Sequence, residues 1–363
     1  MDIENILKKL IRYDTTADKE NGKIILWISD FLKSKSLRVE IFTDKKSGKS
    51  VLFASAGPEK NIGLYFVGHT DTVPAGDGWK YEPFSLTKKG DKLFGLGTSD
   101  MKGGIAAALS AIARIDPEKL KRGFGMVFTF DEEKTFGGIR YFSRKKEIRS
   151  GKIIIMEPTD GKPIVATKGV AAFRIEFLGR AAHGSVPDLG KNAIEMANAF
   201  IFKLQSFYGE IKKEKEAVFD PEFATLNIAK ISGGDAINKV PARCVLEFEM
   251  RTIKGGQADE IVSQVKKILE EERLEATMEV LLKSDPIMNE KSEFSKMMER
   301  LAGKKLTSAN YMTEASFLNE NGNEAVIIGP GPVMAHKADE YVSKKSLEKM
   351  TDIYRKAIEQ VCF

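Results

Sequence analysis

Cysteine, histidine and long apolar runs are scarce in this sequence of 363 residues. Its two cysteines, Cys244 and Cys362, are too few for a disulfide scaffold or a cysteine-rich zinc site. The apolar runs stop well short of the ~20 residues that a membrane-spanning helix needs. The first residues lack a basic segment followed by an apolar run, so we expect no signal peptide and a cytoplasmic protein that does not enter a membrane.

The charged residues do not gather into a surface for nucleic acid. The chain has 57 Lys and Arg against 52 Asp and Glu, spread along its length, for a formal charge of +5. Because no basic stripe carries interleaved aromatic residues, we expect no nucleic-acid partner. The mild positive balance suits a small anionic substrate. An apolar content of 42% and a charged content of 30% are typical of ordinary globular domains.

The first part of the chain alternates between two apolar periodicities. Helical spacing runs over residues 3–10, 24–32 and 103–115, and short apolar runs at 62–68, 125–130 and 152–156 predict buried strands. Strands that alternate with helices are typical of an α/β fold, here a mixed, largely parallel sheet flanked by helices. Such sheets bind ligands beyond the carboxyl ends of their strands, where the motifs below fall.

The pattern changes at about residue 169. From there to residue 283 the predicted order is β-α-β-β-α-β, which is typical of a ferredoxin-like α+β domain. After residue 283 the chain returns to the first fold with an apolar strand at 324–328. We therefore expect residues 1–168 and 284–363 to form the two parts of one domain, into which residues 169–283 are inserted.

The first two motifs combine a histidine or an aspartate with glycines. His69 lies in the motif GHTDTVP, and Asp71 could accept the second N–H of a metal-bound imidazole and fix its tautomer. Asp100 lies in GLGTSDMKGG before a small-residue helix, where it could present a carboxylate to two metals. Taken singly, a strand-end histidine in a turn and a helix-capping aspartate explain these residues equally well or better.

The remaining motifs supply acids and the other two histidines. Glu132 and Glu133 end the apolar strand in FDEE, and because strand side chains alternate, one could bind metal while the other acts as a base. Glu157 ends a strand in MEPT, and His183 and His336 lie in the loop motifs GRAAHGS and AHKADE. An acidic helix start, a solvated strand end and loop histidines are the alternatives.

The motifs together favour a metal centre. Five residues follow predicted strands of one sheet and supply two imidazoles and three carboxylates: His69, Asp100, Glu133, Glu157 and His336. Nitrogen and oxygen ligands in this mixture suit zinc, with cobalt or manganese as alternatives. If Asp100 bridges, each of two divalent metals has one histidine, one glutamate and the shared aspartate, with room for a bridging water.

These motifs, in this order, resemble the family of co-catalytic zinc aminoacylases and carboxypeptidases, which includes acetylornithine deacetylase and succinyl-diaminopimelate desuccinylase. The resemblance covers nearly the whole chain. It implies that His69 and Glu157 hold one metal, that Glu133 and His336 hold the other, and that Asp100 bridges them. It further implies a cis peptide bond after Asp100 and a role for Glu132 as general base.

The resemblance also implies a homodimer formed through the inserted domain. His183 would then reach the active site of the partner subunit. Asn238 and Arg251 resemble residues that grip the substrate carboxylate and the oxyanion, and Thr313 resembles another substrate contact. Residues 1–168 and 284–363 would be the catalytic domain, and residues 169–283 the dimerisation or lid domain.

The implied reaction is hydrolysis of the amide bond of an N-acyl amino acid, closest to acetylornithine deacetylase. A metallo-carboxypeptidase or dipeptidase, or a carrier-protein-linked lysine hydrolase of the same family, is the alternative. Leu96, Met156 and Thr167 depart from the family pattern without removing a metal ligand.

Two other classes of protein are alternatives to a metal-dependent hydrolase. An inactive binding protein on the same fold would be favoured by the loss of a ligand or of Glu132, and none is missing. A dinucleotide-dependent oxidoreductase is disfavoured because Asp100 occupies the third glycine position of G-x-G-x-x-G.

Overall fold

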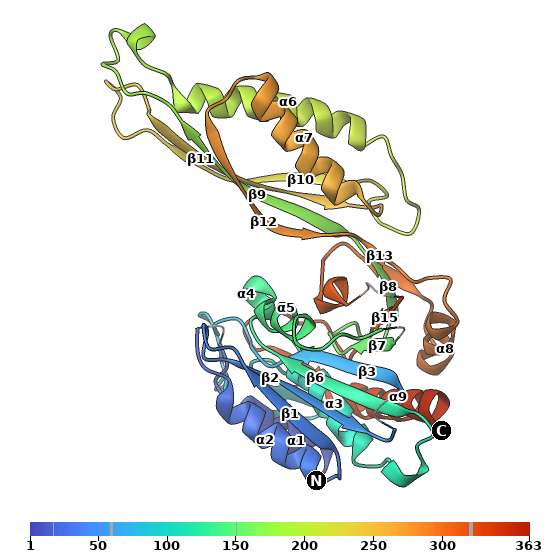
Figure 1. Ribbon diagram of the computed structural model, residues 1–363. Coiled ribbons are helices and arrows are strands. Elements are labelled where there is room, and N and C mark those ends of the chain that lie inside the picture. The colour runs from blue at the N-terminus through green and yellow to red at the C-terminus, as the bar shows by residue number, and fades with distance from the viewer. Residues whose placement is uncertain (17, 59–60, 150, 319–321) are drawn as a thin grey trace. The chain divides into compact units, whose positions relative to one another are not determined.

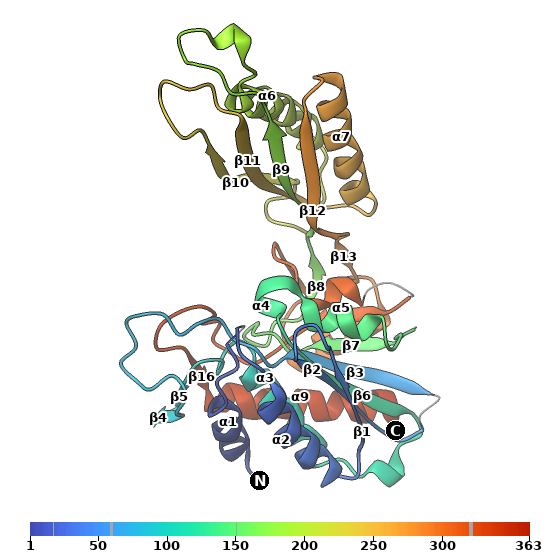
Figure 2. The ribbon, with the colours of Figure 1, turned by 60° about the vertical axis from the view of Figure 1, so that its left-hand side comes forward.

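The computed structural model describes residues 1–363 except 17, 59–60, 150 and 319–321 (Figures 1 and 2). The chain divides into two compact units. Unit 1 comprises Met1–Val165, Asn289–Thr307 and Thr313–Phe363, and unit 2 comprises Ala166–Met288 and Ser308–Met312. Unit 2 thus extends a few residues beyond the expected insertion at both ends, and the later segment Ser308–Met312 joins it.

The main sheet is mixed and has a parallel centre. Its order is β1-β2-β6-β3-β7-β15-β8-β13, with β14 paired to β8. The neighbours β6, β3, β7 and β15 run parallel, whereas the pairs on either side are antiparallel. The strands are β1 (Arg38–Thr43), β2 (Ser50–Ala56), β3 (Ile62–His69), β6 (Gly123–Thr129), β7 (Lys152–Ile155), β8 (Ile164–Thr167), β13 (Ile287–Met288), β14 (Thr307–Ala309) and β15 (Glu324–Ile327).

Helices cover both faces of this sheet. Figures 1 and 2 show α1, α2, α3 and α9 on one face and α4 and α5 on the other. The helices are α1 (Ile3–Ile11), α2 (Gly22–Lys33), α3 (Lys102–Ile112), α4 (Glu132–Thr135), α5 (Gly137–Ser143), α8 (Glu293–Ala302) and α9 (Lys344–Cys362), with short 3-10 turns η1 (Pro117–Lys119) and η3 (Glu314–Phe317). The mixed α/β fold class predicted from the sequence is confirmed.

The sequence explains why these helices pack as they do. In α1 the residues Ile3, Ile6, Leu7 and Leu10 recur at helical spacing and are all buried. Every residue of α3 is buried, because its glycines and alanines let neighbouring elements approach closely from all sides. No helix among the described residues is both long and apolar enough to cross a bilayer.

A second, three-stranded sheet joins distant parts of the sequence. It has the order β16-β5-β4, with β4 (Thr87–Lys89), β5 (Lys92–Phe94) and β16 (Tyr341–Ser343). In its register Tyr341 pairs with Phe94, so the loop before β16 is brought beside the loop after β5. Both loops carry residues of the predicted metal centre.

Unit 2 contains an antiparallel sheet of order β10-β11-β9-β12 and two long helices. Its elements are β9 (Gly169–Leu178), η2 (Pro187–Leu189), α6 (Ala193–Ile211), β10 (Thr225–Gly233), β11 (Arg243–Thr252), α7 (Gln257–Glu271) and β12 (Ala276–Ser284). The rings of Phe173 and Phe248 stack with centroids 4.9 Å apart in its core, and Phe200 of α6 packs beside them. The β-α-β-β-α-β order and the antiparallel sheet agree with the predicted ferredoxin-like class.

Candidate metal centre

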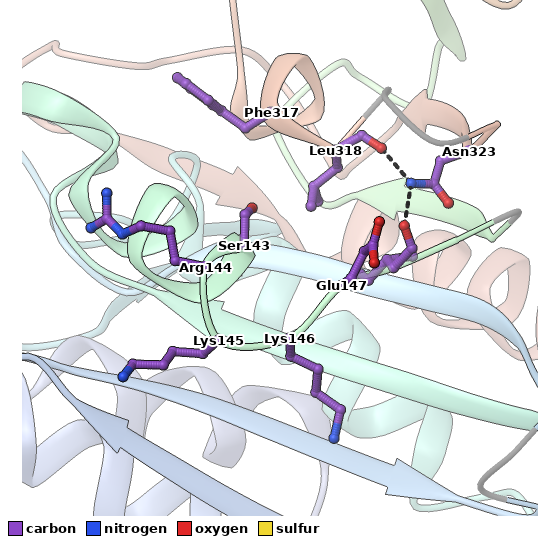
Figure 3. Close-up of a pocket in the computed structure, with 9 residues that line it drawn as sticks. Ser143, Arg144, Lys145, Lys146, Glu147, Phe317, Leu318 and Asn323 are labelled. Carbon is purple, nitrogen blue, oxygen red and sulfur yellow. Dashed lines mark hydrogen bonds between the residues drawn. The ribbon is translucent and has the colours of Figure 1, made fainter.

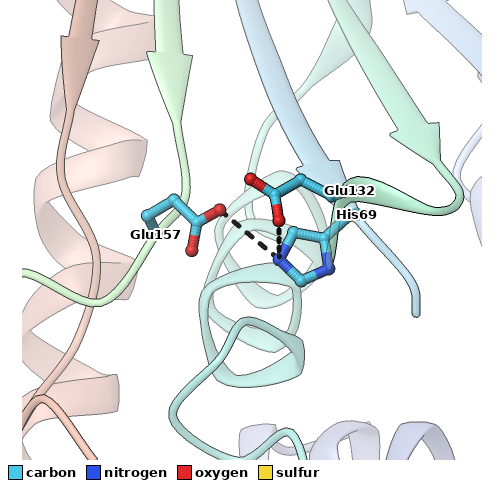
Figure 4. Close-up of side chains that lie close together, drawn as sticks. All are labelled: His69, Glu132 and Glu157. Carbon is cyan, nitrogen blue, oxygen red and sulfur yellow. Dashed lines mark ion pairs between the residues drawn. The ribbon is translucent and has the colours of Figure 1, made fainter. Parts of the chain in front are cut away.

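Three of the predicted residues lie at the carboxyl ends of adjacent parallel strands. His69 is the last residue of β3, Glu132 begins α4 directly after β6, and Glu157 follows β7. β3 lies between β6 and β7 in register, with His69 paired to Thr129. Figure 4 shows the side chains of these three residues pointing toward one another, beyond the ends of three adjacent strands.

Asp100 reaches the same place by a different route. We expected it after a strand of the main sheet, and this was wrong: Asp100 follows β5 of the three-stranded sheet and precedes α3. The chain between β3 and α3 forms β4 and β5 of this small sheet, and the loop after β5 carries Asp100. The Asp100–Met101 peptide bond is cis, as the resemblance implies.

In the first group of side chains, three carboxylates lie close to the His69 imidazole. Its Nε2 lies 3.2 Å from Asp100 Oδ1, 3.4 Å from Glu157 Oε1 and 4.0 Å from Glu132 Oε2. His69 is completely buried and Glu157 is only 6% exposed. An imidazole and three acids therefore share one largely dehydrated pocket.

A second group lies on the other side of Asp100. His336 Nε2 lies 2.9 Å from Glu133 Oε2 and 3.8 Å from Asp100 Oδ2. The His336 side chain is 56% exposed, so this group faces solvent more than the first does. Asp100 thus turns one carboxylate oxygen toward each of the two histidines.

The second nitrogen of His69 is held by Asp71, but through the backbone. His69 Nδ1 lies 3.1 Å from the backbone oxygen of Asp71 and 3.6 Å from its carboxylate Oδ1. The carboxylate Oδ2 instead accepts a hydrogen bond from the backbone N–H of Glu133. Asp71 therefore contacts both His69 and the segment that carries Glu132 and Glu133.

The electrostatics of the pocket are those of crowded acids. Burial, with the neighbouring charge of Asp100, raises the pKa of Glu157 to about 8. Burial also raises the pKa of Glu132 well above its usual value. Burial lowers the pKa of His69, but Glu157 and Asp100 outweigh it and raise that pKa well above normal. Such a cluster favours a bound cation, which would relieve the repulsion.

The spacing of the donor atoms fits a metal ion. Ligands about 2.0–2.2 Å from a tetrahedral zinc ion lie roughly 3.3–3.6 Å from one another. Donor atoms of His69, Glu132 and Glu157 lie within 4.8 Å of one another, and so do those of His69, Asp100 and Glu133. The separations of His69 Nε2 from Asp100 Oδ1 and from Glu157 Oε1, 3.2 and 3.4 Å, match the spacing of ligands on one ion, so these three residues could share a divalent cation.

Two further buried acids beside the pocket were not singled out by the sequence. Glu314 is fully buried and accepts a hydrogen bond from Thr129 Oγ1, and burial raises its pKa to about 7. Glu340 is 2% exposed, and burial raises its pKa to about 7 as well. Glu340 ends the motif AHKADE and Glu314 follows Thr313, yet residue type alone does not tell a buried acid from a solvated one.

The predicted substrate contacts fall in both units. Thr313 belongs to unit 1, is buried, and caps η3 by accepting from the backbone N–H of Ala315. His183 is exposed in unit 2, and its Nδ1 lies 2.7 Å from Ser185 Oγ. The backbone N–H of Gly184 donates to the oxygen of Asn238, so His183 and Asn238 lie side by side.

Arg251 is separated from these two residues within unit 2. It lies near the end of β11, opposite Val170, and its guanidinium pairs with Glu249. The loop of Asn238 instead adjoins the start of β11, where Gly233 pairs with Cys244. At ~3.4 Å per residue, the length of β11 places Arg251 and Asn238 too far apart to touch one small ligand from the same subunit.

A hollow in unit 1 lies apart from the predicted residues. It is lined by residues 143–148 together with Phe317, Leu318 and Asn323 (Figure 3). Asn323 Nδ2 closes one side by donating to the backbone oxygens of Leu318 and Ile148. Figure 3 shows Lys145 and Lys146 directed away from the hollow, and Lys146 pairs with Glu40. These two lysines therefore place no positive charge inside the hollow.

Comparison with known proteins places the chain in a family. Residues 65–360 match the sequence profile of peptidase family M20/M25/M40. The chain belongs to this family. Acetylornithine deacetylase of Pasteurella multocida is 33% identical over 359 residues, covering 96% of this chain and 94% of the relative. The protein is accordingly a metal-dependent hydrolase of amide bonds.

Solved structures of the family share the fold. An M20 family metallo-carboxypeptidase from Sulfolobus solfataricus superimposes with a TM-score of 0.79 at 16% identity, covering 99% of each chain. A dinuclear metal-binding M20 peptidase from Bacillus subtilis gives a TM-score of 0.70 at 14% identity, covering 99% of this chain and 97% of its own.

Proposed function

We propose that this M20 hydrolase removes the acyl group from an N-acyl amino acid with the help of two divalent metal ions. The observation that carries the proposal is the position of Asp100. Its Oδ1 faces His69 Nε2 at 3.2 Å and its Oδ2 faces His336 Nε2 at 3.8 Å. A carboxylate that bridges two metal ions must turn one oxygen toward each ligand set, and Asp100 does so toward the two imidazoles.

The ligands divide into two sets around Asp100. His69 and Glu157 would hold one cation, and His336 and Glu133 the other. Zinc suits this mixture of nitrogen and oxygen donors, with cobalt or manganese as alternatives. The Bacillus subtilis relative of the same fold is described as dinuclear, which supports two ions here. When bound, the two ions would polarise the scissile carbonyl and acidify a water molecule.

Glu132 is the acid left over when the ligand sets are complete. It stands 4.0 Å from His69 Nε2, farther than Asp100 or Glu157, although it too could reach a cation from there. We assign it as the general base, which takes a proton from the attacking water and then gives it to the departing amine. The raised pKa that burial gives Glu132 suits a group that must hold this proton between the two steps.

The acyl amino acid is proposed from the curated relatives. Proteins named acetylornithine deacetylase match nearly the whole chain at about one-third identity, such as that of Pasteurella multocida at 33%. N-acetylornithine is therefore our first candidate substrate. Dipeptides and N-succinyl-diaminopimelate are the alternatives that a substrate panel must separate.

The proposed reaction also involves unit 2 and a second subunit. We propose a homodimer in which His183 stabilises the oxyanion in the partner's site, because His183 and Asn238 are exposed side by side on unit 2. Arg251, at the far end of β11, and Thr313 would contact the substrate from their own subunit. We place the enzyme in the cytoplasm, an assignment supported by the two cysteines, which are both free and buried.

The test is the variant Glu132→Gln. It should bind two metal ions per chain, as the unchanged protein does, while its kcat falls by about 10²–10⁴-fold. Glu118→Gln, on the exposed face of η1, is the matched control and should alter neither quantity. Metal content is measured by elemental analysis, and turnover on N-acetylornithine, N-succinyl-diaminopimelate and dipeptides. Near-normal turnover of Glu132→Gln would reject this role, and a metal-free unchanged protein would reject the centre.

A further inference from the structure

The carboxylate of Glu340 is bound almost entirely by backbone N–H groups of one short loop. Its Oε2 accepts from Gly97 at 2.8 Å, and its Oε1 accepts from Ser99 at 2.6 Å and from Asp100 at 2.8 Å. The backbone oxygen of Glu340 also accepts from the N–H of Gly95. One buried residue thus holds the whole loop that delivers Asp100.

The backbone shape of this loop depends on glycine at two points, Gly95 with a φ of +155° and Gly97. Gly97 has a φ of +81°, and a Cβ there would lie 2.9 Å from Thr72 Cγ2. Its N–H is thereby turned toward Glu340 Oε2. The buried Lys102 follows the loop and donates its ammonium hydrogen bond elsewhere, to the backbone oxygen of Tyr13.

Glu340 belongs to the second ligand-bearing segment, because it lies four residues after His336. Ser99 provides another link between the two segments: its Oγ donates to the oxygen of Pro332 and accepts from the N–H of Met334. The loop of Asp100 and the loop of His336 are therefore tied together on either side of the histidine.

We propose that Glu340 is a positioning residue that fixes Asp100 and His336 relative to each other and thereby sets the affinity for the metal ions. The inference rests on the proposed metal centre, since it concerns how two of its ligands are held. The hydrogen bonds described for the Glu340 carboxylate all come from the backbone of the Asp100 loop, and Glu340 is not itself among the proposed ligands. Outer partners of this kind usually contribute about 10–100-fold to metal affinity or activity.

The substitution Glu340→Gln tests this with little change in volume. Its single oxygen can still accept from Ser99 and Asp100, but its NH₂ group then faces the N–H of Gly97, donor against donor. We expect metal affinity to fall by about 10-fold or more, with the thermal midpoint of the metal-free chain close to that of the unchanged protein. Excess metal should restore turnover, which a general loss of folding would not allow.

The matched control is Asp339→Asn, the same chemical change one residue earlier. Asp339 Oδ1 accepts from the backbone N–H groups of Lys80 and Tyr81, not from the Asp100 loop. Its metal affinity should stay close to that of the unchanged protein. If Glu340→Gln does not fold, Ser99→Ala removes the other tie between the loops and should weaken metal binding by a smaller factor.

Affinity is measured by competition of each apo protein with a chromophoric chelator for zinc. Unchanged zinc affinity in Glu340→Gln, or in Ser99→Ala if that variant must replace it, would overturn the inference while leaving the metal centre standing. An equal fall in Asp339→Asn would overturn it too, because the effect would then belong to the loop in general. Absence of zinc binding by the unchanged protein would instead defeat the proposed function.

Discussion

The two units display their polar residues in opposite ways. In unit 1 the residues His69, Asp71 and Glu157 are 0–6% exposed and are held by several elements at once. In unit 2 the residues His183 and Asn238 are exposed at a loop edge. Acids and imidazoles that are buried together interact strongly, and such a cluster favours a bound cation, whereas exposed residues are free to meet another molecule. The comparison separates a buried cluster of charged side chains within one chain from two exposed residues that we propose face a partner subunit.

The largest effect that would break this comparison is expected from Asp100→Ala. We expect both cations to be lost, because each ligand set shares this carboxylate. Each cation contributes several kcal/mol to the reaction, so kcat/KM should fall on the order of 10⁴-fold or more. Elemental analysis and initial rates measure the two quantities, and Asp30→Ala, on the exposed side of α2, is the control. Retention of both cations would show that Asp100 does not bridge.

A core substitution in unit 2 tests whether the units stand alone. Phe173 is fully buried and stacks on Phe248, so Phe173→Ala should lower the free energy of unfolding by about 3–5 kcal/mol. Urea unfolding of unit 2 should shift, while zinc affinity at the centre in unit 1 is retained. A matching loss of zinc affinity would mean that the centre depends on unit 2.

Removal of the exposed histidine sharpens the other side of the comparison. His183→Ala should lower kcat by roughly 10²–10³-fold, the usual cost of one oxyanion donor, without changing metal content or the thermal midpoint. When the His183→Ala and Glu132→Gln proteins are mixed and allowed to exchange subunits, each mixed dimer should have one complete site. About a quarter of the normal activity should return if His183 acts across a two-fold dimer. Without any recovery, His183 acts within its own subunit or not at all.

The smallest predicted effect compares helix caps in the two units. Asn192 caps α6 by accepting from Ile194 and Glu195, and Ser292 caps α8 by accepting from Ser295. Asn192→Ala and Ser292→Ala should each cost about 1 kcal/mol of stability. Denaturant midpoints report both, and activity should be unaffected in each. A larger activity loss in either variant would give that helix start a role beyond capping.

Much of the fold could be predicted because its apolar periodicity is strong. The central strands and α1 follow simple patterns, and the order of unit 2 follows its alternating strands. The strands β1 and β2 and the helix α9 were not predicted. β1 alternates charged and apolar residues with little burial, so its sequence resembles an exposed segment. Its place is fixed by antiparallel pairing with β2, which periodicity does not reveal.

The candidate site likewise has residues that the sequence predicted and features that it did not reveal. His69, Asp100, Glu133, Glu157 and His336 were nominated by their motifs, and the structure brings them together. The part that we propose for Glu340 could not be foreseen, because it depends on three backbone N–H groups that every residue type except proline supplies. The path of Asp100 through the three-stranded sheet was also missed, since β5 has only three residues.

The pairing of β16 with β5 has a consequence for how this protein is made. β15 completes the parallel centre, and β16 brings the His336 loop to that of Asp100, yet both strands come after the whole of unit 2 in the sequence. The chain must therefore be synthesised through β16 before the loops of Asp100 and His336 can meet. Unit 2 is synthesised earlier and has its own core, so it can fold before β15 and β16 of unit 1 have been made.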